Sequence, residues 1–151
     1  MYQKDLRIKN TFTIASENHQ KNNFKVAENL YKKILKINPD HFGSIFYLGV
    51  LLLETNNLNR AKQLFQKAIR IQPNHAPAHN NLGIIFDALE EVQESIYSYQ
   101  RAIRIQPNYA SAHNNLGMVF QKLGEFRKAI ISYQTAIKIQ SNYVAAHHNL
   151  G

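Results

Sequence analysis

The sequence predicts an all-α fold, a solenoid of antiparallel helix hairpins. The first observation is a glycine that returns every 34 residues, at Gly49, Gly83, Gly117 and Gly151. The second is that its neighbours return with it, since HisAsnAsnLeuGly is spelled at 79–83 and again at 113–117. The third is that apolar residues fall at helical spacing twice within each period. A fixed period of this length indicates stacked repeats.

Each period contains two helical patterns joined by a short turn. The first surrounds the glycine, as in Leu82, Phe86 and Leu89, and the second follows the turn, as in Val92, Ile96, Tyr99 and Ile103. The turns centre on Asn56, Glu90 and Gly124. Gly and Asn suit the left-handed conformation that ends many helices, whereas Glu does not. The turn at Glu90 is therefore predicted to be the strained one.

A glycine inside a helix needs a reason, because it costs about 1 kcal/mol relative to alanine. Small residues recur twelve positions after it, at Ala61, Ser95 and Ala129. We interpret the glycine as the place where the two helices of a hairpin cross too closely for a side chain. The small residues are then expected to form the opposite half of that contact.

The full pattern resembles the tetratricopeptide repeat. Aromatic residues follow the small ones at Phe65, Tyr99 and Tyr133, alanines follow at 68, 102 and 136, and Pro73 and Pro107 end two units. The resemblance implies a right-handed α-solenoid. It covers residues 8–151, read as a degenerate repeat at 8–41 without the glycine, repeats at 42–75, 76–109 and 110–143, and a truncated first helix at 144–151. Residues 1–7 are read as a lead-in.

The last segment leaves the second helix of 110–143 thinly covered. Residues 144–151 are too short to cover the apolar flank of 127–139. Two explanations stay open. The chain is a piece of a longer protein, or its open end stacks on, or swaps with, a second copy to give a homo-oligomer.

Composition excludes several classes of protein. No apolar run approaches the ~20 residues of a membrane span, and no signal-peptide core follows Met1. The chain has no cysteine, so it has neither disulfides nor a thiolate site. No phosphate-binding loop or catalytic constellation is found. We therefore expect a cytoplasmic protein that is not an enzyme and that uses no cofactor.

The resemblance also implies where a ligand binds, because first helices line the concave groove in this family. The groove residues expected for a protein or peptide partner are Phe46, Tyr47, Val50, Leu53, Asn80, Asn81, Ile84, Asn114, Asn115, Met118, Gln121, His148 and Asn149. Phe12, Ser16, His19 and Glu54 also fall on this face. The lining is apolar in the N-terminal half and rich in amides in the C-terminal half.

The amides form the most informative feature of this surface. Asn81, Asn115 and Asn149 occupy one position in successive repeats. A carboxamide both donates and accepts, so it can pair with a peptide backbone of any sequence. The row resembles the asparagine ladder of O-linked N-acetylglucosamine transferases. By contrast, the carboxylate clamp of chaperone-binding repeats is not expected, since Phe46 and Val50 stand in place of its Lys and Asn, and Ser111 and Asn115 in place of its Lys and Arg.

Two other patterns have ordinary explanations. His79, His113 and His147 form a column, but helices about 8–10 Å apart cannot share a metal through ~2 Å bonds, so no metal site is expected. The formal net charge of +8 places basic rows on the second helices, such as Lys67 and Arg70. We interpret these rows as a solvated outer face, and nucleic acid as an unfavoured partner.

The sequence therefore favours a scaffold that binds an extended or helical peptide segment in its concave groove. One alternative is a scaffold that assembles with itself through open-ended stacking or swapping. Another is a substrate-recruiting arm of a larger enzyme, such as a glycosyltransferase.

Overall fold

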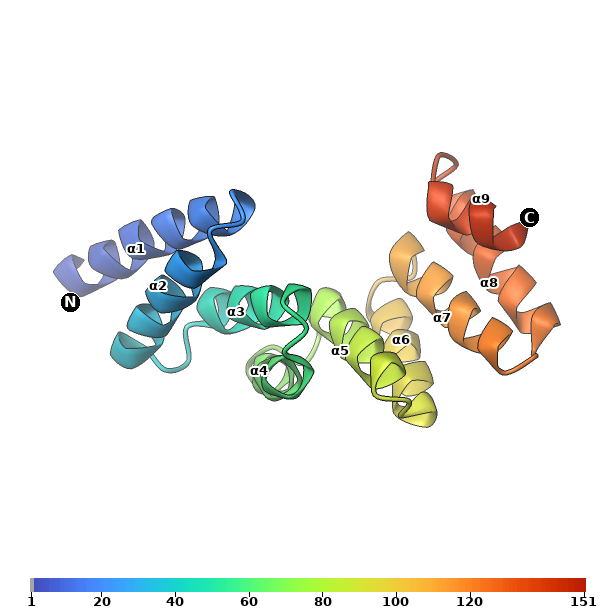
Figure 1. Ribbon diagram of the computed structural model, residues 1–151, viewed down its shortest axis with the longest axis horizontal. Helices are drawn as coiled ribbons and strands as arrows, with labels where there is room; N and C mark the ends of the chain where they lie inside the picture. Colours follow the sequence, from blue (N-terminus) through green and yellow to red (C-terminus); the bar gives the residue numbers. More distant parts are fainter. Residues whose placement is uncertain (1) are drawn as a thin grey trace. The chain divides into compact units, whose positions relative to one another are not determined.

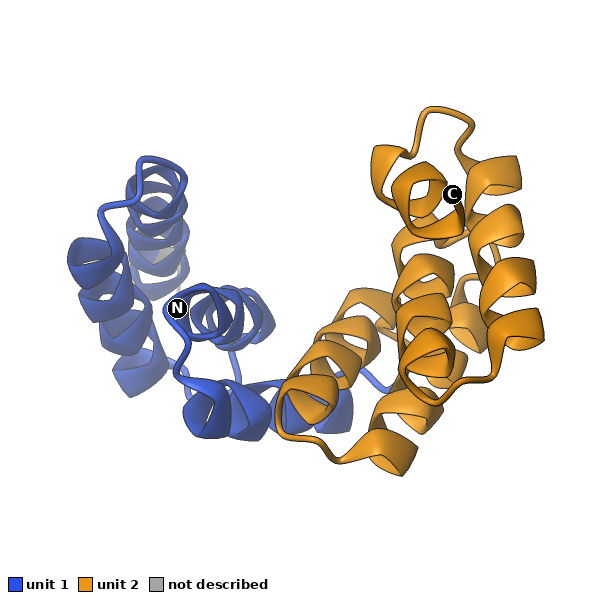
Figure 2. Ribbon diagram, turned by 45° about the vertical axis from the view of Figure 1, so that its right-hand side comes forward, with its two compact units in different colours: residues 1–73 blue, residues 74–151 orange. Residues whose placement is uncertain are grey.

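A computed structural model describes residues 2–151, which are helical apart from short connections (Figure 1). The chain divides into two compact units, Met1–Pro73 and Asn74–Gly151, and each is described by itself (Figure 2). No strand occurs among the described residues. The predicted all-α solenoid class is confirmed.

Unit 1 contains two helix hairpins. The helices are α1 (Tyr2–Gln20), α2 (Phe24–Ile37), α3 (Phe42–Glu54) and α4 (Leu58–Ile71). α1 packs against α2, α3 packs against α4, and α2 joins the hairpins by packing against α3. α1 begins at Tyr2, so the described residues 2–7 of the segment read as a lead-in are part of the first helix.

Unit 2 contains two hairpins and a further short helix. The helices are α5 (Ala76–Ala88), α6 (Val92–Ile105), α7 (Ala110–Lys122), α8 (Phe126–Ile139) and α9 (Val144–Leu150). α5 pairs with α6 and α7 with α8, while α6 packs on α7 and α8 on α9. The first helices α5, α7 and α9 also touch in series. The placement of repeat boundaries within these units stays a prediction.

The repeated glycines lie where an aromatic ring of the partner helix crosses them. A Cβ on Gly83 would lie 2.6 Å from the ring of Tyr99, and one on Gly117 would lie 2.6 Å from the ring of Tyr133. At Gly49 the corresponding distance to Phe65 is 3.0 Å. The close crossing is therefore confirmed. The small residues are not the whole opposite half of this contact, because an aromatic ring of the partner helix fills the space beside each glycine.

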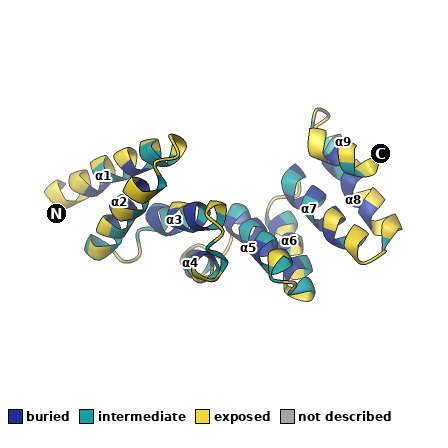
Figure 3. Cartoon of the chain, in the orientation of Figure 1, coloured by how far each residue is buried: buried dark blue, intermediate teal, exposed yellow. Residues whose placement is uncertain are grey.

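The small residues have their own part in the same contact. Ala61, Ser95 and Ala129 are buried, and the Ser95 hydroxyl donates to the Gly83 carbonyl at 3.0 Å. Figure 3 shows the buried residues on the helix sides that face one another. A side chain larger than serine at these positions would separate the two helices of the hairpin.

The helix-ending turns adopt the left-handed backbone that their glycines and asparagines favour. Asn56 and Gly124 have φ of 59° and 72°, and Asn22 shows that the degenerate repeat keeps the same turn. Glu90 has φ of 60°, although a Cβ makes this region unfavourable by about 1–2 kcal/mol. The prediction of a strained turn between α5 and α6 is confirmed.

Two helices in equivalent places are capped by histidine, which the sequence did not reveal. His41 Nδ1 accepts from the Ser44 amide at 3.2 Å, and His75 Nδ1 accepts from the Ala78 amide at 3.2 Å. Only a neutral ring can accept at this nitrogen. Burial lowers the pKa of His41, and burial together with nearby His79 lowers the pKa of His75. The folded state therefore favours the capping form of both rings.

The second helices of unit 2 differ in how well they are covered. On α6, Val92 and Ile96 pack with Tyr99 and with Phe120 of α7. On α8, the equivalent Phe126 is 63% exposed, and α9 covers only the far end of the helix around Ile137. Within the predicted flank 127–139, Ile130 and Ile131 are 44% and 63% exposed, so the expectation of thin cover there is confirmed.

Candidate functional site

The asparagines of unit 2 are joined across successive first helices. Asn115 Nδ2 donates to Asn80 Oδ1 at 3.2 Å, and Asn149 Nδ2 donates to Asn114 Oδ1 at 3.0 Å. Each bond joins residues 35 apart, which is one more than the repeat length. The amides thus link α5 to α7 and α7 to α9.

The same separation recurs in other polar contacts between first helices. Lys122 Nζ lies 2.6 Å from Asp87 Oδ2 in unit 2, and His19 Nε2 lies 2.8 Å from Glu54 Oε2 in unit 1. Both pairs are 35 residues apart. A residue on one first helix therefore contacts the position just after its equivalent on the next first helix, as Asn80 contacts Asn115 and not its equivalent Asn114. This register brings equivalent side chains into a row within each unit.

The predicted amide lining separates into two layers. Asn81, Asn115 and Asn149 are half-buried, whereas Asn80 and Asn114 are only 4% and 3% exposed. The expectation that Asn80 and Asn114 line an open groove is corrected, because both lie between stacked helices and accept bonds from the next repeat. The outer layer is the one that a ligand could reach.

The outer amides keep part of their hydrogen-bonding capacity. Asn81 is half-buried, and no hydrogen bond joins its side chain to another described residue. Asn115 and Asn149 each use one N–H within the stack and retain a second. Three amides in one row, with unused N–H groups, could pair with an extended backbone.

The remaining predicted residues of unit 2 differ in exposure. Met118, Gln121 and His148 are exposed. Gln121 Oε1 accepts from the Tyr133 hydroxyl at 2.6 Å, which fixes the orientation of its amide. Ile84 is half-buried and packs on the core around Tyr99, so less of it is available to a ligand.

The predicted residues of unit 1 form an aromatic surface on α3. Tyr47 is exposed, while Phe46, Val50 and Leu53 are half-buried. Phe46 stacks on Phe42 with ring centroids 6.1 Å apart and meets Tyr47 edge-on at 5.3 Å. Rigid aromatic groups of this kind offer contact area at little cost in conformational entropy.

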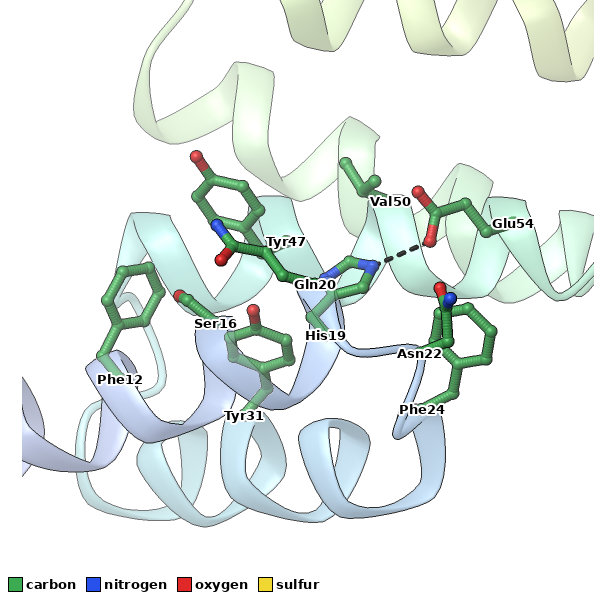
Figure 4. A pocket seen from close by; sticks show the side chains of 10 residues that line it. All are labelled: Phe12, Ser16, His19, Gln20, Asn22, Phe24, Tyr31, Tyr47, Val50 and Glu54. Carbon is green, nitrogen blue, oxygen red and sulfur yellow. Dashed lines mark hydrogen bonds and ion pairs between the residues drawn. The ribbon is translucent and has the colours of Figure 1, made fainter.

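Unit 1 also contains a pocket of about 620 Å³ between α1, α2 and α3 (Figure 4). Its lining comprises Phe12, Ser16, His19, Gln20, Asn22, Phe24, Tyr31, Tyr47, Val50 and Glu54. Sequence reasoning placed Phe12, Ser16, His19, Tyr47, Val50 and Glu54 on this face. The others lie outside the first-helix positions that the resemblance assigns to the groove, since Phe24 and Tyr31 belong to α2 and Gln20 and Asn22 to the end of α1 and the turn after it.

The floor of this pocket holds a buried hydroxyl. Tyr31 is fully buried, and its Oη meets no described residue with good hydrogen-bond geometry, although the Ser16 side chain is near enough to partly offset the effect of burial on its pKa. Figure 4 shows the ring rising between Ser16 and His19, with the hydroxyl directed into the pocket. Burial is the main cause that raises the pKa of Tyr31, so the group remains a neutral phenol.

The histidine column acts within the stack. His113 Nε2 lies 3.0 Å from the Pro107 carbonyl, and His147 Nε2 lies 2.8 Å from the Ser141 carbonyl. Each ring therefore ties the start of a first helix to the turn before it. Within the described part of the chain, no group of three His, Cys, Asp or Glu side chains could hold a metal ion.

Several basic residues outside the first helices pair with carboxylates. Lys67 Nζ lies 3.0 Å from Asp40 Oδ1, and Glu28 Oε1 lies 2.7 Å from Lys32 Nζ and 3.2 Å from Arg60 Nη2. Such pairs reduce the positive field that an outer basic row would offer to a polyanion. The exclusion of nucleic acid stays a prediction.

None of the helices that the structure describes has the length and apolar character required to cross a membrane.

Sequence profiles of the tetratricopeptide repeat match residues 19–83 and 110–143, and a further TPR repeat profile matches residues 85–124. A comparison with curated proteins finds no match. Among solved structures, a crystal structure of MamA is similar at 30% identity and a TM-score of 0.82, over 91% of this chain and 80% of that chain.

Two further structures have the same fold. An O-GlcNAc transferase from Thermobaculum terrenum is 26% identical with a TM-score of 0.83, over 89% of this chain but 26% of that chain. PilF from Pseudomonas aeruginosa is 17% identical with a TM-score of 0.87, over 98% of this chain and 68% of that chain. With three repeat profiles and a relative at 30% identity, the chain belongs to the tetratricopeptide repeat family and is a protein-interaction scaffold.

Proposed function

We propose that the first-helix surface of this chain binds a peptide segment of a partner protein. The observation that carries the proposal is the row of Asn81, Asn115 and Asn149, which are held in one register and keep unused N–H groups. Spacing by repeat suits an extended backbone, whose N–H and C=O groups recur whatever its side chains. The amides would fix the backbone, and exposed side chains such as Met118 would contact the peptide's own.

The test begins with a peptide selected from a displayed library of random 12-residue segments against the intact chain. The peptide is labelled, and its dissociation constant is measured by fluorescence anisotropy. Asn81→Ala is the cleanest variant, because no hydrogen bond joins this amide to another described residue and its loss should disturb the stack least. Two hydrogen bonds to the peptide are at stake, so affinity should fall about tenfold.

The matched control replaces exposed amides on the second helices. Gln100→Ala and Gln134→Ala remove carboxamides at equivalent positions of α6 and α8. We expect both to bind the peptide like the unaltered chain. Equal affinity for Asn81→Ala and these controls would remove the asparagine row from the proposed function.

Self-assembly is a second candidate function, supported by the apolar surface at α8 and α9. Phe126 and Ile131 are each 63% exposed, and Val144 is 79% exposed. Large apolar side chains left exposed in this way are candidates for contact with another chain. Sedimentation velocity of the unaltered chain and of Phe126→Glu tests this. A monomer at high micromolar concentration would exclude assembly through this surface.

A third candidate is a recruiting arm of a larger enzyme, supported by the likeness to part of the Thermobaculum terrenum O-GlcNAc transferase. In this case the repeats would hold a polypeptide substrate and the chemistry would lie outside them. A transferase assay on the isolated chain should then be negative while peptide binding persists.

A further inference from the structure

The pocket of unit 1 has walls that suit a planar cation. Phe12 meets Tyr47 edge-on with centroids 5.8 Å apart, and it lies 6.0 Å from Tyr31. At the other end, Phe24 meets His19 at 5.9 Å. The faces of aromatic rings carry negative electrostatic potential and attract Lys or Arg side chains within about 6 Å.

The charge of the lining residues favours a ligand of positive charge. Among the ten described residues that line the pocket, Glu54 is the one carboxylate and neither Lys nor Arg occurs. His19 Nε2 pairs with Glu54 Oε2, and no described group bonds to Glu54 Oε1. A carboxylate ligand would be repelled, whereas a guanidinium could donate to the unused oxygen in a charge-assisted hydrogen bond.

The buried hydroxyl of Tyr31 is an independent indication of a ligand. A buried polar group without a partner of good hydrogen-bond geometry costs about 1–3 kcal/mol, and this one lies at the floor of the pocket between Ser16 and His19. His19 covers it with ring centroids 6.2 Å apart. Movement of the His19 side chain away from Glu54 would expose both acceptors, the phenol oxygen and the carboxylate, to the same group.

We propose that this pocket binds an arginine side chain of the partner, with the guanidinium between Tyr47 and Glu54 and directed toward Tyr31. A planar guanidinium stacks on aromatic rings and presents several N–H donors at once, which an ammonium does not. The proposal deepens the peptide-binding function proposed above by naming a side chain that the partner supplies. It does not depend on the asparagine row, because every lining residue belongs to unit 1.

The experiment uses the intact chain and a probe with one side chain. N-acetyl-arginine N-methylamide is titrated while amide and ring signals are followed by NMR, and the citrulline analogue serves as a neutral probe of the same shape. We expect arginine to shift signals of the pocket residues and to bind about tenfold more tightly than citrulline. Equal binding of the two probes, or no shift in the pocket at millimolar arginine, would overturn the proposal.

Two variants and one matched control locate the interaction. Glu54→Gln should remove the preference for arginine over citrulline, while Asp87→Asn, which removes the carboxylate paired with Lys122 in unit 2, should leave it unchanged. Tyr31→Phe should weaken arginine binding several-fold without lowering the urea midpoint of unfolding. A preference that survives Glu54→Gln would contradict the assignment.

The two proposals fail separately. If Asn81→Ala leaves peptide affinity unchanged, the arginine probe still reports on the pocket, because a single side chain does not need the amides. If the probe fails while the selected peptide binds, the arginine assignment is wrong and the peptide-binding function stands.

Discussion

In both units, residues 35 apart contact each other across successive first helices, but the residue types that meet there differ. In unit 1 the side chains 35 residues apart are His19 and Glu54, set beside an aromatic pocket. In unit 2 they are asparagine pairs and the ion pair of Asp87 with Lys122. The backbone crossing therefore sets which positions meet, and it leaves the residue type free. Under the two proposals above, unit 1 would receive a side chain and unit 2 a peptide backbone.

The largest expected effect follows from truncating a core leucine of unit 2. Leu82 is 3% exposed, and Leu82→Ala should destabilise the fold by about 3 kcal/mol through lost burial and a cavity. Because repeats contact only their neighbours, hydrogen exchange should accelerate more in α5–α9 than in α1–α4. Leu48→Ala is the matched variant in unit 1 and should reverse the order. Equal acceleration in both units for both variants would contradict separate units.

The next largest effect is a difference between the units in the stability lost when a crossing glycine is replaced by alanine. Gly83→Ala places a Cβ 2.6 Å from the buried Tyr99 ring, so overpacking of about 1–3 kcal/mol should exceed the helix gain of about 1 kcal/mol. At Gly49 the ring of Phe65 lies 3.0 Å away, and alanine should be nearly neutral. Urea denaturation measures both. A larger loss for Gly49→Ala would show that the two crossings are not distinguished by these distances.

The turns predict a gain in stability. Glu90 holds a left-handed φ of 60°, so Glu90→Gly should stabilise unit 2 by about 1 kcal/mol once the entropy of the unfolded chain is included. Asn56→Gly in unit 1 should change stability less, since asparagine tolerates this region. Thermal denaturation should show a higher midpoint for the first variant, and a lower one would mean that Glu90 makes a contact that outweighs its backbone cost.

The smallest effect concerns the histidine caps. The folded pKa values of His41 and His75 lie below the ordinary 6.5, so their contribution is complete above pH 6.5 and is lost as pH falls toward the folded pKa. The loss should not exceed about 1 kcal/mol each, the typical value of an N-cap. His41→Asn and His75→Asn retain a cap that does not titrate. The free energy of unfolding, measured from pH 7 to pH 5, should therefore fall less steeply for both variants than for the unaltered chain. An unchanged slope would show that neither ring caps in its neutral form.

Much of the fold could be read from the period alone. Gly83 and Tyr99 recur one period later as Gly117 and Tyr133, and this recurrence predicted the hairpins. The positions of Asn56, Glu90 and Gly124 predicted the turns between helices. These features depend on local backbone preference and on helical spacing, which the chain order fixes. The candidate site was predicted less completely, since repeat position identifies a helix face but not the depth of a side chain on it.

What the sequence determined by itself is the repeat, its helices and the row of equivalent asparagines. Only the tertiary structure decided that Asn80 and Asn114 lie beneath that row, that Tyr31 reaches the pocket from a second helix, and that contacts fall 35 residues apart. The physical reason is that burial and pairing depend on how neighbouring helices cross. That crossing arises from many packed side chains together, and no single repeat specifies it.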